Sequence, residues 1–334
     1  MRQATLGRQG PSVSALGLGC MGMSGTYGPA DRAESLATVH AALDAGITLL
    51  DTGDFYGMGH NEMLLGEALK DVPRDRFQVS VKFGALRDAA GGWAGYDARP
   101  AAVKNFLAYT LQRLGLDHVD IYRPARLDPD VPIEDTVGAI AEMVQAGHVR
   151  HVGLSEVGAE TLRRAAAVHP IADLQIEYSL LSRGIEDAIL PAARELGIGV
   201  TAYGVLSRGL IGAGGRKPGF AAGDIRTRMP RFDAANVQAN LALVAALQRV
   251  ADGMDASVAQ LAFAWVAAQG AKHGADIVPL VGARRRDQLV EVLGAADIVL
   301  DEAAVTAIEA AMPKGAAVGD RYNAPQMAML DSEA

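Results

Sequence analysis

The chain has 334 residues, half of them hydrophobic, and a formal net charge of −8. This length supports one large core, and α/β barrels routinely reach it as a single domain. The acidic balance argues against a nucleic-acid partner, which needs a surplus of basic side chains to neutralise phosphates.

Cysteine content and the N-terminal segment bear on the compartment. Cys20 is the only cysteine, so the chain can form no internal disulfide framework and fits a reducing environment. The N-terminal residues lack the apolar core of a signal peptide, and no apolar run approaches the roughly 20 residues of a membrane span. We therefore expect a cytoplasmic protein with no membrane partner.

Apolar runs and helical periodicities alternate along the chain. Strands are predicted at residues 13–18, 48–50, 77–82, 119–122, 149–153, 174–176, 199–203 and 277–280. Helices are predicted at residues 32–45, 61–70, 100–114, 133–146, 159–168, 185–196, twice between 235 and 269, and at 286–293. Eight β-α units without a shift in composition predict a (β/α)₈ TIM barrel, one domain over residues 1–334.

Three connections are too long to be turns: residues 85–99, 207–234 and the tail 312–334. We expect all three at one rim of the barrel. The second is basic and is either a solvated loop or a cover for a phosphate; its basic residues are Arg208, Arg216, Lys217, Arg226, Arg228 and Arg231.

Ionisable side chains follow two neighbouring strands. Asp51 ends one strand, Tyr56 lies in the loop beyond it, and Lys82 ends the next strand. Chemistry is done at that edge of parallel α/β sheets. A tyrosine with a pKa near 10 donates a proton poorly unless a nearby cation favours its phenolate, and Lys82, aimed by Asp51, can supply that cation. The three predict a proton donor for a carbonyl that receives hydride; the alternative is a structural Asp–Lys pair.

The order of the motifs along the chain resembles the aldo-keto reductase family. The matching residues are Asp51-Thr52, Tyr56-Gly57, Asn61-Glu62, Val81-Lys82-Phe83-Gly84, Gly153-Leu154-Ser155, Gln175, Tyr203, Leu206-Ser207-Arg208-Gly209, Gly282-Ala283, Gln288, Glu291 and Gly319-Asp320-Arg321-Tyr322. The resemblance implies an enzyme that reduces aldehydes or ketones with a nicotinamide cofactor, and in which Asp51, Tyr56 and Lys82 are catalytic.

The resemblance also implies a cofactor site. The expected contacts are Gly19, Cys20, Met21, Ser155, Gln175, Tyr203, Gly204, Leu206, Ser207, Arg208, Gly282, Ala283, Arg284, Gln288 and Glu291. Backbone donors and guanidinium groups meet at residues 284–286, which suits a ribose 2′-phosphate and favours NADPH over NADH. The glycines at 17–22 also spell G-x-G-x-x-G, but no helix is expected to open within them, so we favour a strand-end loop over a Rossmann fingerprint.

Where the family usually carries histidine, this chain has Ala125. The alanine version of the segment looks like the pyridoxal reductase branch, so pyridoxal or a bulky ketone is an expected substrate, with Trp93, Ala125 and Arg126 as substrate contacts. Two alternatives remain open, a nucleotide-bound regulatory or scaffold subunit and an alcohol dehydrogenase that works in the oxidative direction. The histidines form no plausible metal set with carboxylates or cysteine, so no metal is expected.

Overall fold

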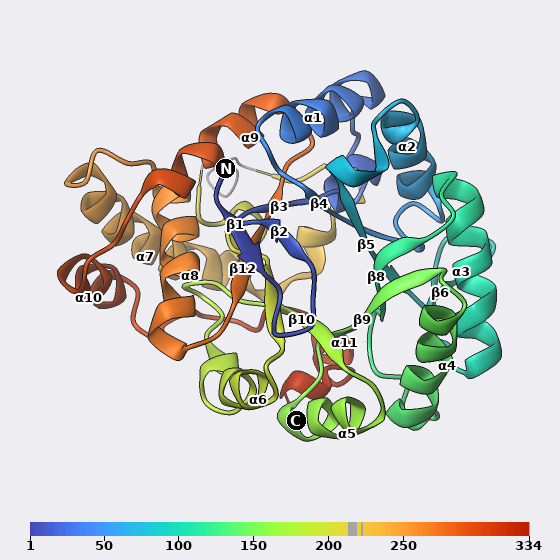
Figure 1. Cartoon of the computed structure of the whole chain (residues 1–334). Helices are drawn as coiled ribbons and strands as arrows, with labels where there is room; N and C mark the ends of the chain where they lie inside the picture. Colours follow the sequence, from blue (N-terminus) through green and yellow to red (C-terminus); the bar gives the residue numbers. More distant parts are fainter. Residues whose placement is uncertain (213–218, 222, 334) are drawn as a thin grey trace.

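A closed parallel barrel forms the centre of the molecule. The structure, a computed structural model, describes residues 1–212, 219–221 and 223–333. Eight strands pair in the closed order β3, β4, β5, β8, β9, β10, β11, β12 (Figure 1). Their bounds are Gly17–Gly19, Leu49–Gly53, Gln78–Phe83, Val119–Pro124, Val149–Ser155, Ile171–Glu177, Gly199–Tyr203 and Ile277–Gly282. The (β/α)₈ TIM barrel predicted from the sequence is therefore confirmed.

Helices surround the barrel in Figure 1. They are α1 (Arg32–Asp44), α2 (His60–Leu69), α3 (Pro100–Leu114), α4 (Ile133–Gln145), α5 (Ala159–Val168), α6 (Ile189–Leu196), α7 (Ala234–Asp252), α8 (Val258–His273), α9 (Arg286–Leu293), α10 (Glu302–Ala311) and the short α11 (Ala324–Met327). The bounds of α3 follow from its end residues, because Pro100 occupies the first turn and Gly115 ends the helix with a left-handed φ of 67°. No described helix is long and apolar enough to cross a membrane.

The strand predicted at residues 13–18 is in fact two strands. β2 (Ser12–Ser14) pairs antiparallel with β1 (Gln3–Thr5), and only β3 enters the barrel. The chain turns between β2 and β3, where the Ser14 hydroxyl donates to the carbonyl of Leu16. The side chain of Val13 is buried against Leu49 and other residues of the barrel interior. A short apolar run does not distinguish a hairpin that closes a barrel from a barrel strand, which explains the error.

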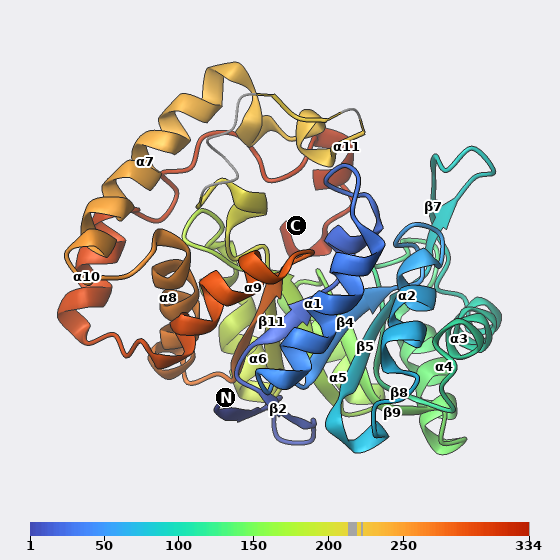
Figure 2. The same cartoon turned by 90° about the horizontal axis from the view of Figure 1, so that it is seen from above.

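The opposite end of the barrel carries the three long connections. Figure 2 shows β7 and α11 on one side of the molecule and β2 with the N-terminus on the other. Residues 85–99, the first long connection, contain a hairpin of β6 (Ala85–Arg87) and β7 (Trp93–Tyr96). The connection after β11 is built from single 3₁₀ turns where it is described, and its Arg216 and Lys217 lie outside the described residues.

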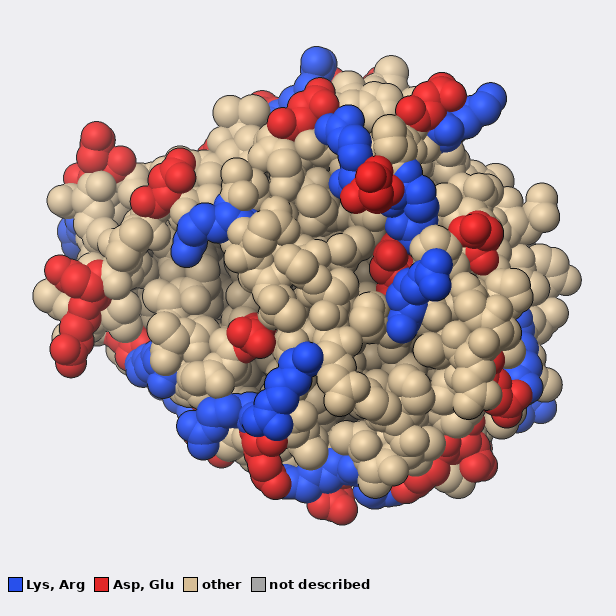
Figure 3. Space-filling view, viewed as in Figure 1, with Lys and Arg blue, Asp and Glu red and all other residues tan. Residues whose placement is uncertain are grey.

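The barrel interior contains a charged layer in addition to its apolar layers. Most of the apolar core lies between strands and helices, and a smaller cluster that includes Leu6 and Leu280 fills the closed end. Between that end and the open rim, Asp51, Lys82 and Arg123 are buried. Buried charges are stable only when they are paired. On the outside, acidic and basic side chains lie next to each other on the face seen in Figure 3.

Gly153 on β9 makes room for this charged layer. A Cβ atom at residue 153 would lie 2.7 Å from Asp173 Oδ1 and 2.9 Å from Ile121 Cγ2. We expect Gly153→Ala to lower the free energy of unfolding by about 1–3 kcal/mol, the usual effect of overpacking a core, in urea denaturation. In the matched variant Gly138→Ala, the new Cβ meets nothing within 4 Å on α4. That variant should be neutral or more stable, since alanine favours helix. Equal stability of the two variants would contradict this account of Gly153.

Candidate active site

Asp51 and Lys82 form a buried ion pair at the open end of the barrel. Lys82 Nζ lies 2.5 Å from Asp51 Oδ1, and each residue is 4% exposed. The pair follows from strand register, because β4 and β5 run side by side with Gly53 opposite Lys82. Tyr56 follows β4, and its ring centroid is 5.2 Å from Lys82 Nζ. The structure thus brings together the three side chains predicted from the sequence.

The protein environment favours a protonated Tyr56. Burial of the hydroxyl raises its pKa well above the ordinary value, and the charge of Asp51 adds to this, while Arg126 is the strongest influence that lowers it. This direction is opposite to the one predicted from Lys82, because burial outweighs the neighbouring cations. Burial also lowers the pKa of Lys82, although the negative charge of Asp51 acts to raise it. Tyr56 therefore retains a proton to donate at neutral pH.

The second oxygen of Asp51 has two further donors. Ser80 Oγ donates to Asp51 Oδ2 at 3.0 Å, and Gln175 Nε2 donates to the same oxygen at 2.7 Å. Gln175 was expected to contact the cofactor, and its amide nitrogen also donates to the carboxylate of Asp51. The buried Ser155 Oγ has no hydrogen-bond partner among the described residues. An unpartnered buried hydroxyl at the end of β9 suits a ligand amide, so this part of the site fits a nicotinamide carboxamide.

The tail is fixed to the barrel rim through Glu156. Arg321 Nη2 pairs with Glu156 Oε2 at 2.5 Å, and Arg321 Nη1 lies 3.4 Å from Glu177 Oε2. Tyr203 OH donates to Glu156 Oε1 at 2.6 Å and lies 3.0 Å from Tyr322 OH. Burial raises the pKa of Glu156, but Arg321 outweighs it and the pKa lies well below the ordinary value.

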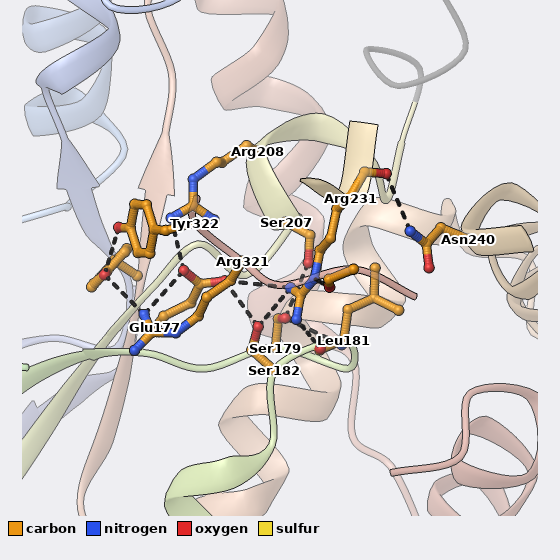
Figure 4. Close-up of polar contacts among 12 residues, drawn as sticks. Glu177, Ser179, Leu181, Ser182, Ser207, Arg208, Arg231, Asn240, Arg321 and Tyr322 are labelled. Carbon is orange, nitrogen blue, oxygen red and sulfur yellow. Dashed lines mark hydrogen bonds and ion pairs between the residues drawn. The ribbon is translucent and has the colours of Figure 1, made fainter. Parts of the chain in front are cut away.

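Arg208 and Arg231 bring the loop after β11 onto the same cluster (Figure 4). Arg208 Nη2 donates to Glu177 Oε2 at 2.8 Å, and its guanidinium lies 4.5 Å from the Tyr322 ring centroid. Arg231 Nη2 donates to the carbonyl of Leu181. Figure 4 also shows Ser207 beside Ser179 and Ser182 of the loop after β10, with its hydroxyl 3.1 Å from Ser179 Oγ. The expected cofactor residues Ser207 and Arg208 thus lie at the rim, above β10.

The same loop reaches across the rim to the segment after β3. The Ile225 amide donates to the carbonyl of Thr26 at 3.2 Å. The guanidinium of Arg226 stacks 5.3 Å from the Tyr27 ring centroid. Ion pairing of Arg226 with Asp224 stiffens the crossing. The described residues of this loop therefore contact the segment after β3 on the other side of the rim.

The three consecutive arginines before α9 differ in their partners. Arg285 pairs with Asp287, and Arg286 pairs with Glu34. Arg284 Nη1 donates to two backbone carbonyls, those of residues 27 and 28, and its backbone N–H donates to Gln288 Oε1. Within the described residues, no carboxylate forms an ion pair with Arg284. Arg284 is therefore the one of the three arginines that has no ion pair among the described residues.

The remaining predicted residues divide between the rim and the outer surface. Gly19, Cys20, Met21, Gly204, Leu206, Gly282 and Ala283 lie in or directly after β3, β11 and β12, at the open end. Burial raises the pKa of the Cys20 thiol, which fits packing rather than reactivity. Glu291 is exposed on α9. No group of three or more histidine, cysteine or acidic side chains in the described chain is arranged to hold a metal ion.

On the side of the site where we expect the substrate, residue 125 is alanine and not histidine. Ala125 is buried directly after β8, and its amide donates to the carbonyl of Phe83. Arg126 Nη1 donates back to the carbonyl of Ala125 at 2.6 Å, and Arg126 Nη2 lies 3.5 Å from Tyr322 OH. Trp93 is 42% exposed on the projecting hairpin, where its ring contacts Tyr96.

Sequence reasoning missed the polar residues deeper in the barrel. Alternate residues of a strand share a face, so Ser80 lies on the face of Lys82, and Asp173 lies on the face of Gln175. That period-two pattern was readable in the sequence. Asp54 was also missed: burial raises its pKa to about 7, and its Oδ1 atom has no partner among the described residues.

A TIM barrel with a buried Asp–Lys pair and a neighbouring tyrosine at its open rim is the arrangement that the resemblance to the aldo-keto reductases predicts. Residues 15–313 match the model of the aldo/keto reductase family, and the chain belongs to that family. It is therefore an NAD(P)H-dependent oxidoreductase that acts on small carbonyl compounds.

Individual relatives agree with this assignment. The probable aldo-keto reductase 1 from Glycine max is 39% identical over 320 residues, which are 95% of this chain and 90% of the relative. The structure of the glycerol dehydrogenase AKR11B4 from Gluconobacter oxydans has a TM-score of 0.82 at 29% identity, covering 92% of this chain and 94% of the other. The holo form of the aldo-keto reductase AKR11C1 from Bacillus halodurans has a TM-score of 0.74 at 26% identity, with 93% and 96% covered.

Proposed function

We propose that the protein reduces an aldehyde or ketone with NADPH and that Tyr56 donates the proton to the carbonyl oxygen. The observation that carries the proposal is the Asp51–Lys82 ion pair beneath the Tyr56 ring. The cofactor, when bound, supplies the hydride. As Tyr56 gives up its proton, negative charge develops on its oxygen beside the Lys82 cation. That attraction is greater in the transition state than before it, which is the condition for faster chemistry.

Residues at the rim are arranged to hold the cofactor. Ser155 presents its free hydroxyl to the nicotinamide carboxamide, and Tyr203 offers a ring beside it. Arg208, on the loop after β11 and paired with Glu177 at the rim, is the proposed contact for the pyrophosphate. Arg285 and Arg286 are paired with carboxylates, so Arg284 is the arginine proposed to bind a 2′-phosphate. This supports NADPH over NADH.

The substrate of the proposed reductase is pyridoxal or a bulky ketone. Ala125, at the end of β8 and beside Arg126, has a much smaller side chain than histidine, and the substrate would occupy the difference in volume. Without that imidazole, orientation of the carbonyl depends on the fit of the substrate. A ring-shaped substrate that occupies the vacated volume is held by shape, whereas a small aldehyde is not.

A second direction of reaction has an observation in its favour. One structural relative is a glycerol dehydrogenase, so that protein oxidises an alcohol. The same hydride site runs in both directions. The test is a screen of NADPH consumption with pyridoxal, sugar aldehydes and bulky ketones, together with NADP⁺ reduction by the matching alcohols and glycerol. Absence of turnover in every assay would overturn the enzymatic proposal in favour of a nucleotide-bound regulatory subunit.

Tyr56→Phe tests the proton donor. We expect kcat to fall by about a hundredfold or more, the usual contribution of general acid catalysis, with cofactor affinity almost unchanged. Stopped-flow turnover and cofactor fluorescence titration measure the two quantities. Tyr109→Phe, on an exposed face of α3, makes the same chemical change away from the site and should have no effect. Turnover of the Tyr56 variant within about threefold of wild type would exclude the assignment.

Arg284→Ser tests cofactor choice. Losing one charged hydrogen-bonded contact should weaken NADPH by about 1.5–3 kcal/mol and leave NADH nearly unaffected, as measured by calorimetric titration. Arg286→Ser is the matched control, because that arginine is already paired with Glu34, and it should bind both cofactors as wild type does. Equal weakening of NADPH and NADH by Arg284→Ser would show that Arg284 does not read the 2′-phosphate.

Ala125→His tests the vacated volume. The imidazole should clash with a bulky substrate and lower its kcat/KM about tenfold, the factor that corresponds to mild overpacking, while small aldehydes are reduced as well as before or better. Ala125→Ser, which adds little volume, is the control and should preserve the substrate ranking. A uniform gain for small and bulky carbonyls would mean that the enzyme simply lacks a helpful histidine.

A further inference from the structure

Arg123 is a fully buried cation inside the barrel, below the predicted catalytic residues. It lies on β8 with 0% of its surface exposed. Its guanidinium pairs with Asp173 Oδ2 at 3.1 Å and donates to Thr201 Oγ1 at 3.1 Å. Its Nη2 atom donates to Ser80 Oγ at 2.7 Å. A buried ion pair adds little net stability compared with apolar residues of similar volume, so stability alone does not explain it.

Hydrogen-bond chemistry fixes the direction of the contacts from Arg123 to Asp51. An arginine donates hydrogen bonds and cannot accept them, so Ser80 Oγ must accept from Arg123. The single hydroxyl proton of Ser80 is then free to point at Asp51 Oδ2, 3.0 Å away. With Gln175 also donating to Oδ2, the other oxygen, Oδ1, is left for Lys82.

We propose that Arg123 is a positioning residue of the active site, which orients the Ser80 hydroxyl and thereby holds Asp51 in the rotamer that pairs with Lys82. The proposal rests on the proposed function of Asp51, Lys82 and Tyr56. Room for Arg123 comes from Gly153, where a Cβ would lie 2.7 Å from Asp173 Oδ1 and 3.1 Å from Arg123 Nε.

The positive charge of Arg123 also affects the pKa of Lys82. The charged or titratable groups that act on or face Lys82 are Asp51 on β4, Arg123 on β8, Arg126 after β8, Tyr56 after β4 and Cys20 after β3. Burial lowers the pKa of Lys82, Asp51 raises it, and Arg123 lowers it again. Loss of the Arg123 charge should therefore raise the pKa of Lys82. This effect acts through space and is measured separately from the Ser80 hydroxyl link.

Ser80→Ala tests the hydroxyl link. We expect kcat to fall about tenfold, the effect of one lost hydrogen bond to a charged group, while KM and cofactor affinity stay near wild type. Ser14→Ala is a matched control: that buried hydroxyl also makes two hydrogen bonds, to Leu16 and Thr48, at the closed end. Equal kcat values for the two variants would overturn the proposal.

Replacing the pair Arg123 and Asp173 tests the charge. Arg123→Met with Asp173→Asn removes both charges together and leaves no buried charge unpaired, and the oxygen of the new amide can still accept from Thr201. Arg74→Met with Asp120→Asn is the control, a neutralised pair that also involves β8. Arg123→Lys keeps the charge. Thermal melting shows whether each variant is folded.

The pKa of Lys82 is measured directly by NMR, without turnover. The chain has only six lysines, so ¹³C labelling of the lysine side chains gives few signals, and Lys82→Met assigns the one of interest. We expect the Lys82 signal to titrate higher in the neutral pair than in wild type, to remain low in Arg123→Lys and to be unmoved in the control pair. An unchanged Lys82 titration in the neutral pair would overturn the proposal. If the wild type reduces no carbonyl, the proposed function fails, and the titration still decides whether Arg123 acts on Lys82.

Discussion

The ion pair between Asp51 and Lys82 is the interaction on which the active site depends. Both charges are buried in a barrel, where an unpaired charge is strongly unfavourable, so each constrains the position of the other. The register between β4 and β5 fixes the separation between the backbone positions of Asp51 and Lys82. Tyr56 comes within reach because the chain turns directly after β4. Its raised pKa keeps it protonated, and in the proposed mechanism Lys82 stabilises the charge that appears when the proton leaves.

Strand β10 connects this pair to the rest of the barrel. Its alternate residues Asp173, Gln175 and Glu177 face one side of the strand, and each joins a different set of contacts. Asp173 pairs with Arg123 in the interior, Gln175 donates to Asp51 at the level of the active site, and Glu177 pairs with arginines at the rim. Polar contacts thus occur at three levels along one strand, as ion pairs at Asp173 and Glu177 and as a hydrogen bond from a neutral amide at Gln175.

The contacts of Glu156 with Arg321 and Tyr203 fix the C-terminal tail to the barrel rim. Glu156 adopts a left-handed φ of 54°, which is unusual for a residue other than glycine, and its carboxylate accepts from Arg321 and Tyr203. Tyr322 then lies between Tyr203, Arg126 and Arg208. Residues proposed for the cofactor and for the substrate therefore meet on one aromatic ring of the tail. The carboxylate of Glu156 serves this attachment.

The sequence by itself determined the barrel, the family and the grouping of Asp51, Tyr56 and Lys82, because β-α alternation and strand-end motifs are local patterns that the chain order preserves. Tertiary structure decided what depends on distant partners. It placed Val13 in a hairpin that closes the barrel. It paired Arg285 and Arg286 with carboxylates, so that of the three arginines only Arg284 has no ion pair among the described residues. It also directed the Gln175 amide toward Asp51. It also decided that burial, rather than Lys82, sets the direction of the Tyr56 pKa. Burial and pairing arise only when strands far apart in sequence close into one barrel, so no local pattern contains them.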